Sequence, residues 1–287
     1  MGCPAFLQPP VSGVLAAPLR ILKMKQNGSW EGCALPEPPN NGMAEIDGIF
    51  YARRGEGTPV ILLHGAGGTH RHWGELFAPL GATARLIAPD LPGHGRSAPP
   101  GHTSIASYAG VALRLLDALG LDRAVLAGHS MGAAAALEAA LAAPDRVRGL
   151  ALIGASARLR VAPELLRGLA TDPDAAIELL VQWIYPEAAA HLRAPAAAEF
   201  RQCDPAVLRG DFAACDGWDA RPRLGTLRLP ALVICGEADR MTPPKLAREL
   251  QTLLEAELTL LPGVGHMPML EAPEATAAAL QQWLERL

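Results

Sequence analysis

The 287-residue sequence has little lysine, few aromatic residues and an odd number of cysteines. Only 3 of its 25 basic residues are Lys and the net charge is −4, so the composition gives no sign of a nucleic-acid-binding surface. The five cysteines include no C-x-x-C pair, which argues against a disulfide framework or a zinc site and favours a reducing compartment. No run of about 18 apolar residues and no secretory signal pattern occur. We therefore expect a cytoplasmic protein that binds no membrane, nucleic acid or metal.

The apolar content is nevertheless high enough for a large core. Hydrophobic residues make up 50% of the chain and charged residues 19%, which excludes a chain that is disordered throughout. Residues 1–42 differ from the rest, because they hold seven Pro and few periodic apolar positions. We interpret residues 1–42 as a loosely ordered N-terminal extension.

From Met43 onward, short β-rich runs alternate with helical patterns. A hairpin that turns at Asp47-Gly48 is predicted over residues 44–53. Further strands are predicted at residues 60–63, 85–89, 123–127, 150–153, 231–235 and 258–261. Helices are predicted at residues 104–119, 130–143, 243–254 and 273–287. Strands buried on both faces and separated by helices indicate an α/β fold with a mostly parallel central sheet flanked by helices.

Residues 157–227 interrupt this alternation. They are rich in Ala, read as helical and contain Trp183, Tyr185 and Phe200. We predict that they form a helical cap, or lid, over one end of the sheet. The core would then consist of residues 43–156 and 228–287.

The segment Gly128-His129-Ser130-Met131-Gly132 follows a predicted strand and opens an Ala-rich helix. A serine on such a sharp turn has a strained backbone, which brings the residues two before and two after it into close contact. Only small side chains fit there, so Gly128 and Gly132 make sense together. The pattern predicts that Ser130 is a nucleophile.

A serine hydroxyl is a weak nucleophile and needs a base that a third group orients. Two candidates follow later strands: Asp239 comes after the strand at residues 231–235, and His266 after the strand at residues 258–261. Parallel strands place their carboxyl ends on one edge of the sheet, so these side chains are expected near Ser130. Rival acids are Glu237, Asp216 and Asp219.

These motifs together resemble the α/β-hydrolase-fold serine hydrolases, over about residues 43–287. The resemblance implies a nucleophile elbow with Ser130 as nucleophile, His266 as general base and then acid, and Asp239 as the residue that holds the imidazole. It implies a mechanism without a cofactor. Dehalogenases and epoxide hydrolases of this fold carry Asp where Ser130 stands, so their chemistry is not expected here.

An oxyanion hole needs two backbone N–H groups that point at the developing charge. One donor is expected from Met131, the residue after the nucleophile. By resemblance, the second is Ala66, in the glycine-rich loop after His64. By the same resemblance, His64 is expected to brace that loop and His94 to lie in a structural turn. His129 is expected to point away from the serine, because side chains alternate along a strand. The other histidines are expected at the surface or in loops: His70, His72, His102 and His191.

The reaction and the substrate remain open at this level. The first reading is hydrolysis of a carboxylic ester with a small to medium apolar group. A lactone or enol-lactone hydrolase uses the same residues, as does a carbon–carbon bond hydrolase, although such relatives place Trp after the base where this chain has Met267. Acyl transfer to an acceptor other than water, and a non-catalytic ligand-binding module, complete the alternatives. In each case the partner is a small molecule, and the oligomeric state is open.

Overall fold

The structure is a computed structural model that describes residues 23–24, 30–31 and 42–287. The predicted extension, residues 1–42, lies almost entirely outside the described residues. Its two described segments, β1 (Lys23–Met24) and β2 (Trp30–Glu31), pair as antiparallel strands. The remaining elements belong to residues 42–287.

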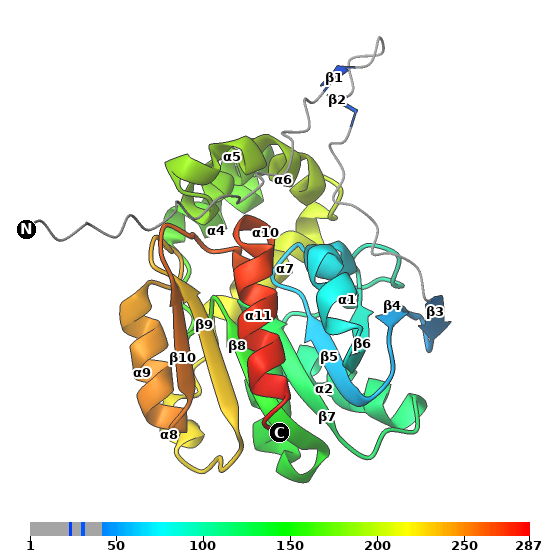
Figure 1. Ribbon diagram of the computed structural model, residues 1–287. Helices are drawn as coiled ribbons and strands as arrows, with labels where there is room; N and C mark the ends of the chain where they lie inside the picture. Colours follow the sequence, from blue (N-terminus) through cyan, green and yellow to red (C-terminus); the bar gives the residue numbers. More distant parts are fainter. Residues whose placement is uncertain (1–22, 25–29, 32–41) are drawn as a thin grey trace, which may run out of the picture. The chain divides into compact units, whose positions relative to one another are not determined.

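An eight-stranded sheet forms the centre of this part of the chain, as Figure 1 shows. From edge to edge its strands are β10 (Glu257–Leu261), β9 (Ala231–Gly236), β8 (Val147–Ile153), β7 (Ala124–His129), β5 (Thr58–Leu63), β6 (Ala84–Pro89), β4 (Ile49–Arg54) and β3 (Met43–Ile46). The strands from β10 to β6 are parallel, whereas β4 and β3 are antiparallel to their neighbours. The predicted hairpin and the mostly parallel sheet are confirmed.

Helices cover both faces because successive strand residues point to opposite sides. Leu150 and Leu152 belong to one apolar cluster, while Ala151 and Ile153 belong to the other. The first cluster is closed by α2 (Ile105–Ala118), α3 (Met131–Ala142) and α9 (Pro244–Leu254). The second is closed by α1 (Gly74–Leu80) and α11 (Pro273–Leu284). The predicted fold class, an α/β sheet flanked by helices, is therefore correct.

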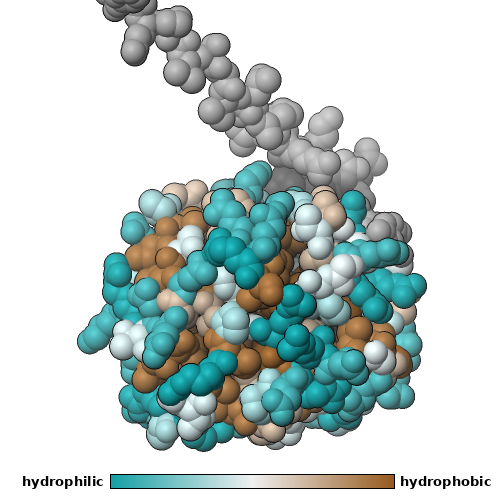
Figure 2. Space-filling view, turned by 60° about the horizontal axis from the view of Figure 1, so that its bottom comes forward, coloured by the Kyte–Doolittle hydropathy of each residue, from teal (hydrophilic) through white to brown (hydrophobic). Residues whose placement is uncertain are grey.

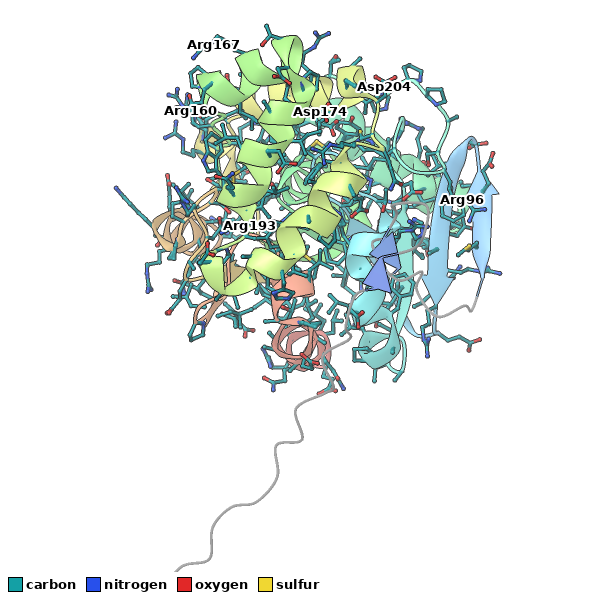
Figure 3. All side chains as sticks on the ribbon, turned by 90° about the horizontal axis from the view of Figure 1, so that it is seen from above. Arg96, Arg160, Arg167, Asp174, Arg193 and Asp204 are labelled. Atoms are coloured by element: carbon teal, nitrogen blue, oxygen red, sulfur yellow. The ribbon has the colours of Figure 1, made fainter. Side chains whose placement is uncertain are left out.

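Between β8 and β9 the chain is helical. Its helices are α4 (Pro163–Thr171), α5 (Pro173–Ile184), η3 (Glu187–Leu192), α6 (Arg193–Phe200), α7 (Pro205–Asp216) and α8 (Arg221–Leu224). In Figure 1, α4, α5 and α6 lie above the carboxyl ends of the parallel strands. Seen from above, these helices spread over that end of the sheet, with Arg160 and Arg167 on one side of the layer (Figure 3).

The opposite end of the molecule carries hydrophilic and hydrophobic residues interspersed over its surface (Figure 2). Across residues 23–24, 30–31 and 42–287, no helix combines the length and the apolar character that crossing a membrane requires. Of the inserted helices, α4, α5 and α6 lie at the carboxyl end of the parallel strands, whereas α8 lies toward the opposite end (Figure 1).

Candidate active site

Ser130 lies between the end of β7 and the start of α3, at φ +52° and ψ −114°. A residue other than glycine rarely adopts a positive φ, and such a conformation costs on the order of 1–3 kcal/mol. The surrounding backbone holds it there: the Ser130 N–H donates to the Ile153 carbonyl at 3.0 Å, and the Ser130 carbonyl accepts from the N–H groups of Ala133 and Ala134. The predicted sharp turn is thus present.

The two glycines of the turn are required by close packing of the backbone. A Cβ atom on Gly132 would overlap the Leu63 carbonyl and would lie 2.5 Å from the His64 carbonyl oxygen. A Cβ atom on Gly128 would lie 2.5 Å from the Ala133 nitrogen. Backbone atoms of a buried sheet cannot move aside, so the sequence prediction that only small residues fit is confirmed.

Asp239 and His266 meet above the ends of β9 and β10. The Nδ1–H of His266 donates to Asp239 Oδ2 at 2.9 Å, and both side chains are buried. Asp239 Oδ1 also accepts the N–H groups of Met241 (2.8 Å) and Thr242 (2.9 Å), and the Thr242 hydroxyl donates to Oδ2 at 2.8 Å. With its Nδ1 proton engaged in this way, the neutral His266 ring has a free lone pair on Nε2.

The surroundings of Asp239 stabilise its ionised form. Burial opposes ionisation, but the adjacent His266 ring and the hydrogen bonds from His266 and Thr242 outweigh burial and lower the pKa of Asp239 to about 2. A carboxylate at this position orients the imidazole and stabilises its protonated form.

The backbone on either side of His266 is fixed by groups that the sequence pattern did not indicate. The carboxylate of Glu271 accepts the Gly265 N–H at 2.7 Å and the Met267 N–H at 2.8 Å. The His266 N–H itself donates to the carbonyl of Ile184, at the end of α5, at 3.0 Å. Thr242 and Glu271 lie within six residues of the groups that they bind, whereas Ile184 comes from the distant helix α5.

Ser130 and His266 line the same cavity of about 260 Å³, together with Ala66. Its apolar lining comes from Leu159, Val161, Phe212, Met241 and Leu246, and its charged lining from Arg158, Arg160, Arg221 and Glu249. An adjoining pocket of about 30 Å³ is also lined by Ser130, His266 and Ala66. Met131 is buried and begins helix α3. The structure therefore brings the five predicted site residues to one region.

The other histidines are held as structural groups. Nε2 of His64 accepts the Leu91 N–H at 2.9 Å, while its Nδ1–H donates to the Gly65 carbonyl at 2.8 Å, as expected of a brace. Burial lowers the pKa of His64 well below its usual value, so its ring is neutral. The ring of His129 lies beside that of His266, with centroids 4.8 Å apart, and its Nε2–H donates to the His266 carbonyl.

Two histidines that were expected at the surface or in loops are buried in a short helix. His70 and His72 lie in the short 3-10 helix η1 (His70–Trp73), and less than a twentieth of either residue is exposed. Oδ1 of Asp90 accepts a hydrogen bond from Nδ1 of His70 at 2.8 Å, and Oε2 of Glu199 lies 3.4 Å from Nε2 of His72. The prediction was wrong because these acidic partners come from distant parts of the chain.

Two of the rival acids, Asp219 and Asp216, bind other groups. Asp219 pairs with Arg221 at 2.6 Å, and Asp216 accepts the Val161 N–H at 3.0 Å. Glu237 is exposed, and its backbone N–H donates to the Leu261 carbonyl. Within the described residues, no group of three or more His, Cys, Asp or Glu side chains is arranged to hold a metal ion.

The sequence pattern of the alpha/beta hydrolase family matches residues 60–279. The chain belongs to the alpha/beta hydrolase family. The matched range contains the Ser130 turn, Asp239 and His266, so the site described above lies within the part of the chain that matches the family.

Individual relatives of this alpha/beta hydrolase differ in their named activities. The dihydrolipoyllysine-residue acetyltransferase component of the acetoin cleaving system of Pseudomonas putida is 36% identical, over 89% of this chain and 72% of that protein. The pimeloyl-(acyl-carrier protein) methyl ester esterase of Pectobacterium carotovorum is 30% identical, over 79% and 94% of the two chains. The enol-lactonase from Burkholderia xenovorans has a TM-score of 0.77 and 26% identity, over 85% of this chain and all of that one.

Proposed function

We propose that the protein is a serine hydrolase that cleaves a carboxylic ester through a covalent acyl-enzyme. The observation that carries the proposal is the shared cavity: the strained Ser130 and the His266 ring, which is paired with Asp239, line one apolar space. A nucleophile, a base and a group that orients the base are the components that acyl transfer requires.

In the proposed mechanism, the Ser130 hydroxyl attacks the carbonyl carbon of the ester while Nε2 of His266 takes its proton. The Asp239 carboxylate stabilises the imidazolium that forms. His266 then donates the proton to the leaving alcohol, which leaves an acyl group on Ser130. A water molecule, deprotonated by His266, attacks this acyl group and releases the acid and the free enzyme.

The negative charge that develops on the carbonyl oxygen needs two N–H donors. Met131 is proposed as one, because the first amide of a helix has no acceptor within that helix and lies at its positive end. Ala66 is proposed as the other, because it lines the cavity beside Ser130. The glycine-rich loop that carries Ala66, residues 64–68, is called the oxyanion loop below.

The proposed substrate is an ester with a small to medium apolar group. The side chains of Leu159, Val161, Phe212 and Met241 support this class, since they form the apolar part of a cavity of about 260 Å³. Phe212 and Val161 belong to the inserted segment, residues 157–227, which we propose acts as the cap of the site. A lactone is the second candidate, favoured by the likeness to an enol-lactonase, because ring opening uses the same acyl transfer chemistry.

The proposal is tested with p-nitrophenyl esters of increasing acyl length, a panel of lactones and a fluorophosphonate probe. The wild-type protein is expected to release nitrophenol and to take the probe, whereas Ser130→Ala should lose at least about three orders of magnitude in rate and all labelling. Ser156→Ala is the matched control, because Ser156 lines the same cavity but donates its hydroxyl to the Arg158 carbonyl at 2.8 Å. Labelling that persists in Ser130→Ala and vanishes in Ser156→Ala would overturn the assignment.

A further inference from the structure

A buried carboxylate from the inserted segment contacts the oxyanion loop. Asp211, in the middle of α7, is fully buried, and its Oδ2 accepts the backbone N–H of Gly67 at 2.9 Å. The same oxygen accepts from Nε2 of His94 at 2.8 Å, and Oδ1 accepts the Tyr108 hydroxyl at 2.5 Å. A buried charge is tolerated only when hydrogen bonds of this kind compensate its lost hydration.

His94 makes this carboxylate part of an ion pair. Burial alone would lower the pKa of His94, but the Asp211 carboxylate, with a further contribution from Cys203, raises it to about 10. The second ring nitrogen, Nδ1, lies 3.1 Å from the Pro92 carbonyl, so each nitrogen has an acceptor and the ring carries both protons. Asp211 is thereby fixed between the turn after β6 and helix α2.

Side chains of the inserted helices pack closely against the oxyanion loop. Gly67 has φ +62°, and a Cβ atom there would lie 2.6 Å from a Leu208 carbon and 2.8 Å from a Phe200 carbon, both in the inserted helices. Inside the loop, the Gly68 N–H donates to the Gly65 carbonyl at 3.1 Å. The hydrogen bond to Asp211 is the link that fixes the peptide plane between Ala66 and Gly67.

We propose that Asp211 is a positioning residue, which holds the Gly67 amide and so aims the neighbouring Ala66 amide at the carbonyl oxygen of the substrate. The inference rests on the proposed function, because it assigns Asp211 a part in forming that oxyanion hole. This role means that the inserted segment does more than cover the substrate, because Asp211 of α7 positions one of the two N–H donors of the oxyanion hole. An oxyanion hole whose N–H donors are slightly misaligned stabilises the transition state less, although it binds the neutral ester about as well.

The test compares two variants that each remove one hydrogen-bonding partner from the same cluster. Asp211→Ala frees the Gly67 amide, whereas Tyr108→Phe removes only the hydroxyl that donates to Oδ1 and leaves the Gly67 contact in place. Both variants should have a lower melting temperature than the wild type, because each leaves buried polar groups without a partner. Only Asp211→Ala should lose kcat on a neutral p-nitrophenyl ester, by about 10- to 100-fold, with KM nearly unchanged.

Two further measurements separate positioning from general stability. Hydrogen exchange of the amides in residues 64–69 should become faster in Asp211→Ala and not in Tyr108→Phe. Asp211→Asn should restore most of kcat, because the amide oxygen can still accept from Gly67 while its NH₂ group donates to the Tyr108 oxygen. If Asp211→Ala does not fold, Asp211→Ser, which leaves space for a water molecule, takes its place in the same comparison.

Equal kcat in the two variants, or losses of kcat that follow the melting temperature alone, would overturn the inference. Failure of the proposed function is visible separately, because Ser130→Ala would then retain the activity of the wild type. If Ser130→Ala is inactive and Asp211→Ala is as active as Tyr108→Phe, the function stands and only the role of Asp211 is refuted.

Discussion

The pairing of Asp239 with His266 leads to a prediction about both stability and rate. The substitution Asp239→Asn retains the size of the side chain, and its amide oxygen can still accept the backbone N–H groups of Met241 and Thr242. Its NH₂ group then faces Nδ1 of His266, which must become an acceptor and place its proton on Nε2. In that tautomer the ring cannot take the Ser130 proton, so kcat should fall on the order of 10⁴-fold.

The stability effect follows from the lowered pKa of Asp239. Its folded pKa of about 2 lies below the ordinary value of 3.8, which corresponds to about 2 kcal/mol of stabilisation by the ionised form. Because the folded pKa is the lower one, this contribution is complete above about pH 4. It is lost as the pH falls toward 2.

The assay is urea unfolding of the wild type and Asp239→Asn at a series of pH values, combined with ester hydrolysis at neutral pH. The difference in unfolding free energy should be about 2 kcal/mol near pH 6 and should shrink toward zero near pH 2. Asp219→Asn is the control: hydrogen bonding to Arg221 also lowers the pKa of Asp219 to about 2, but solvent screens this pair. It should show a small stability effect and normal hydrolysis. Near-normal activity in Asp239→Asn would place the acid elsewhere, and a difference independent of pH would refute the stability argument.

Two other predictions follow from the packing and from the sequence. Gly132→Ala should lower the free energy of unfolding by about 3 kcal/mol in urea, because its Cβ would press on backbone carbonyls. Gly225→Ala is the control and should leave the stability unchanged, because nothing lies within 4 Å of its Cβ. Equal effects of the two substitutions would contradict the packing argument. A chain that begins at Met43 should keep its melting temperature and activity, since residues 1–42 are proline-rich and match no periodic pattern; a drop of several degrees would show that the extension packs on the core.

Much of the sheet could be read from the sequence because buried parallel strands appear as continuous apolar runs. Val60 to Leu63 and the run before Ser130 are examples, and both lie in the centre of the sheet. Helix α1 could not be predicted from the sequence, because it has only seven residues and contains Pro79. A short helix with an internal proline is formed by its packing against the sheet and not by local preference.

The residues of the site likewise include some that the sequence indicates and others that only the folded chain reveals. The turn at Ser130 is a local feature, since the two glycines and the serine that define it lie within five consecutive positions. The meeting of Asp239 with His266 was also predictable, because β9 and β10 are parallel neighbours whose carboxyl ends share one edge. Sequence spacing and strand direction were sufficient for both.

Only the tertiary structure decided which groups surround these residues. Asp211 is 144 residues from the Gly67 amide whose hydrogen bond it accepts. The carbonyl of Ile184, in the inserted segment, accepts the N–H of His266, which lies just before α10 (Pro268–Glu271). Local periodicity reports which face of an element is apolar, but it does not report which distant polar group will satisfy a buried amide. The sequence by itself therefore determined the sheet and the candidate nucleophile, base and acid, whereas the folded chain determined what holds them, because hydrogen-bond partners of buried groups are chosen by packing.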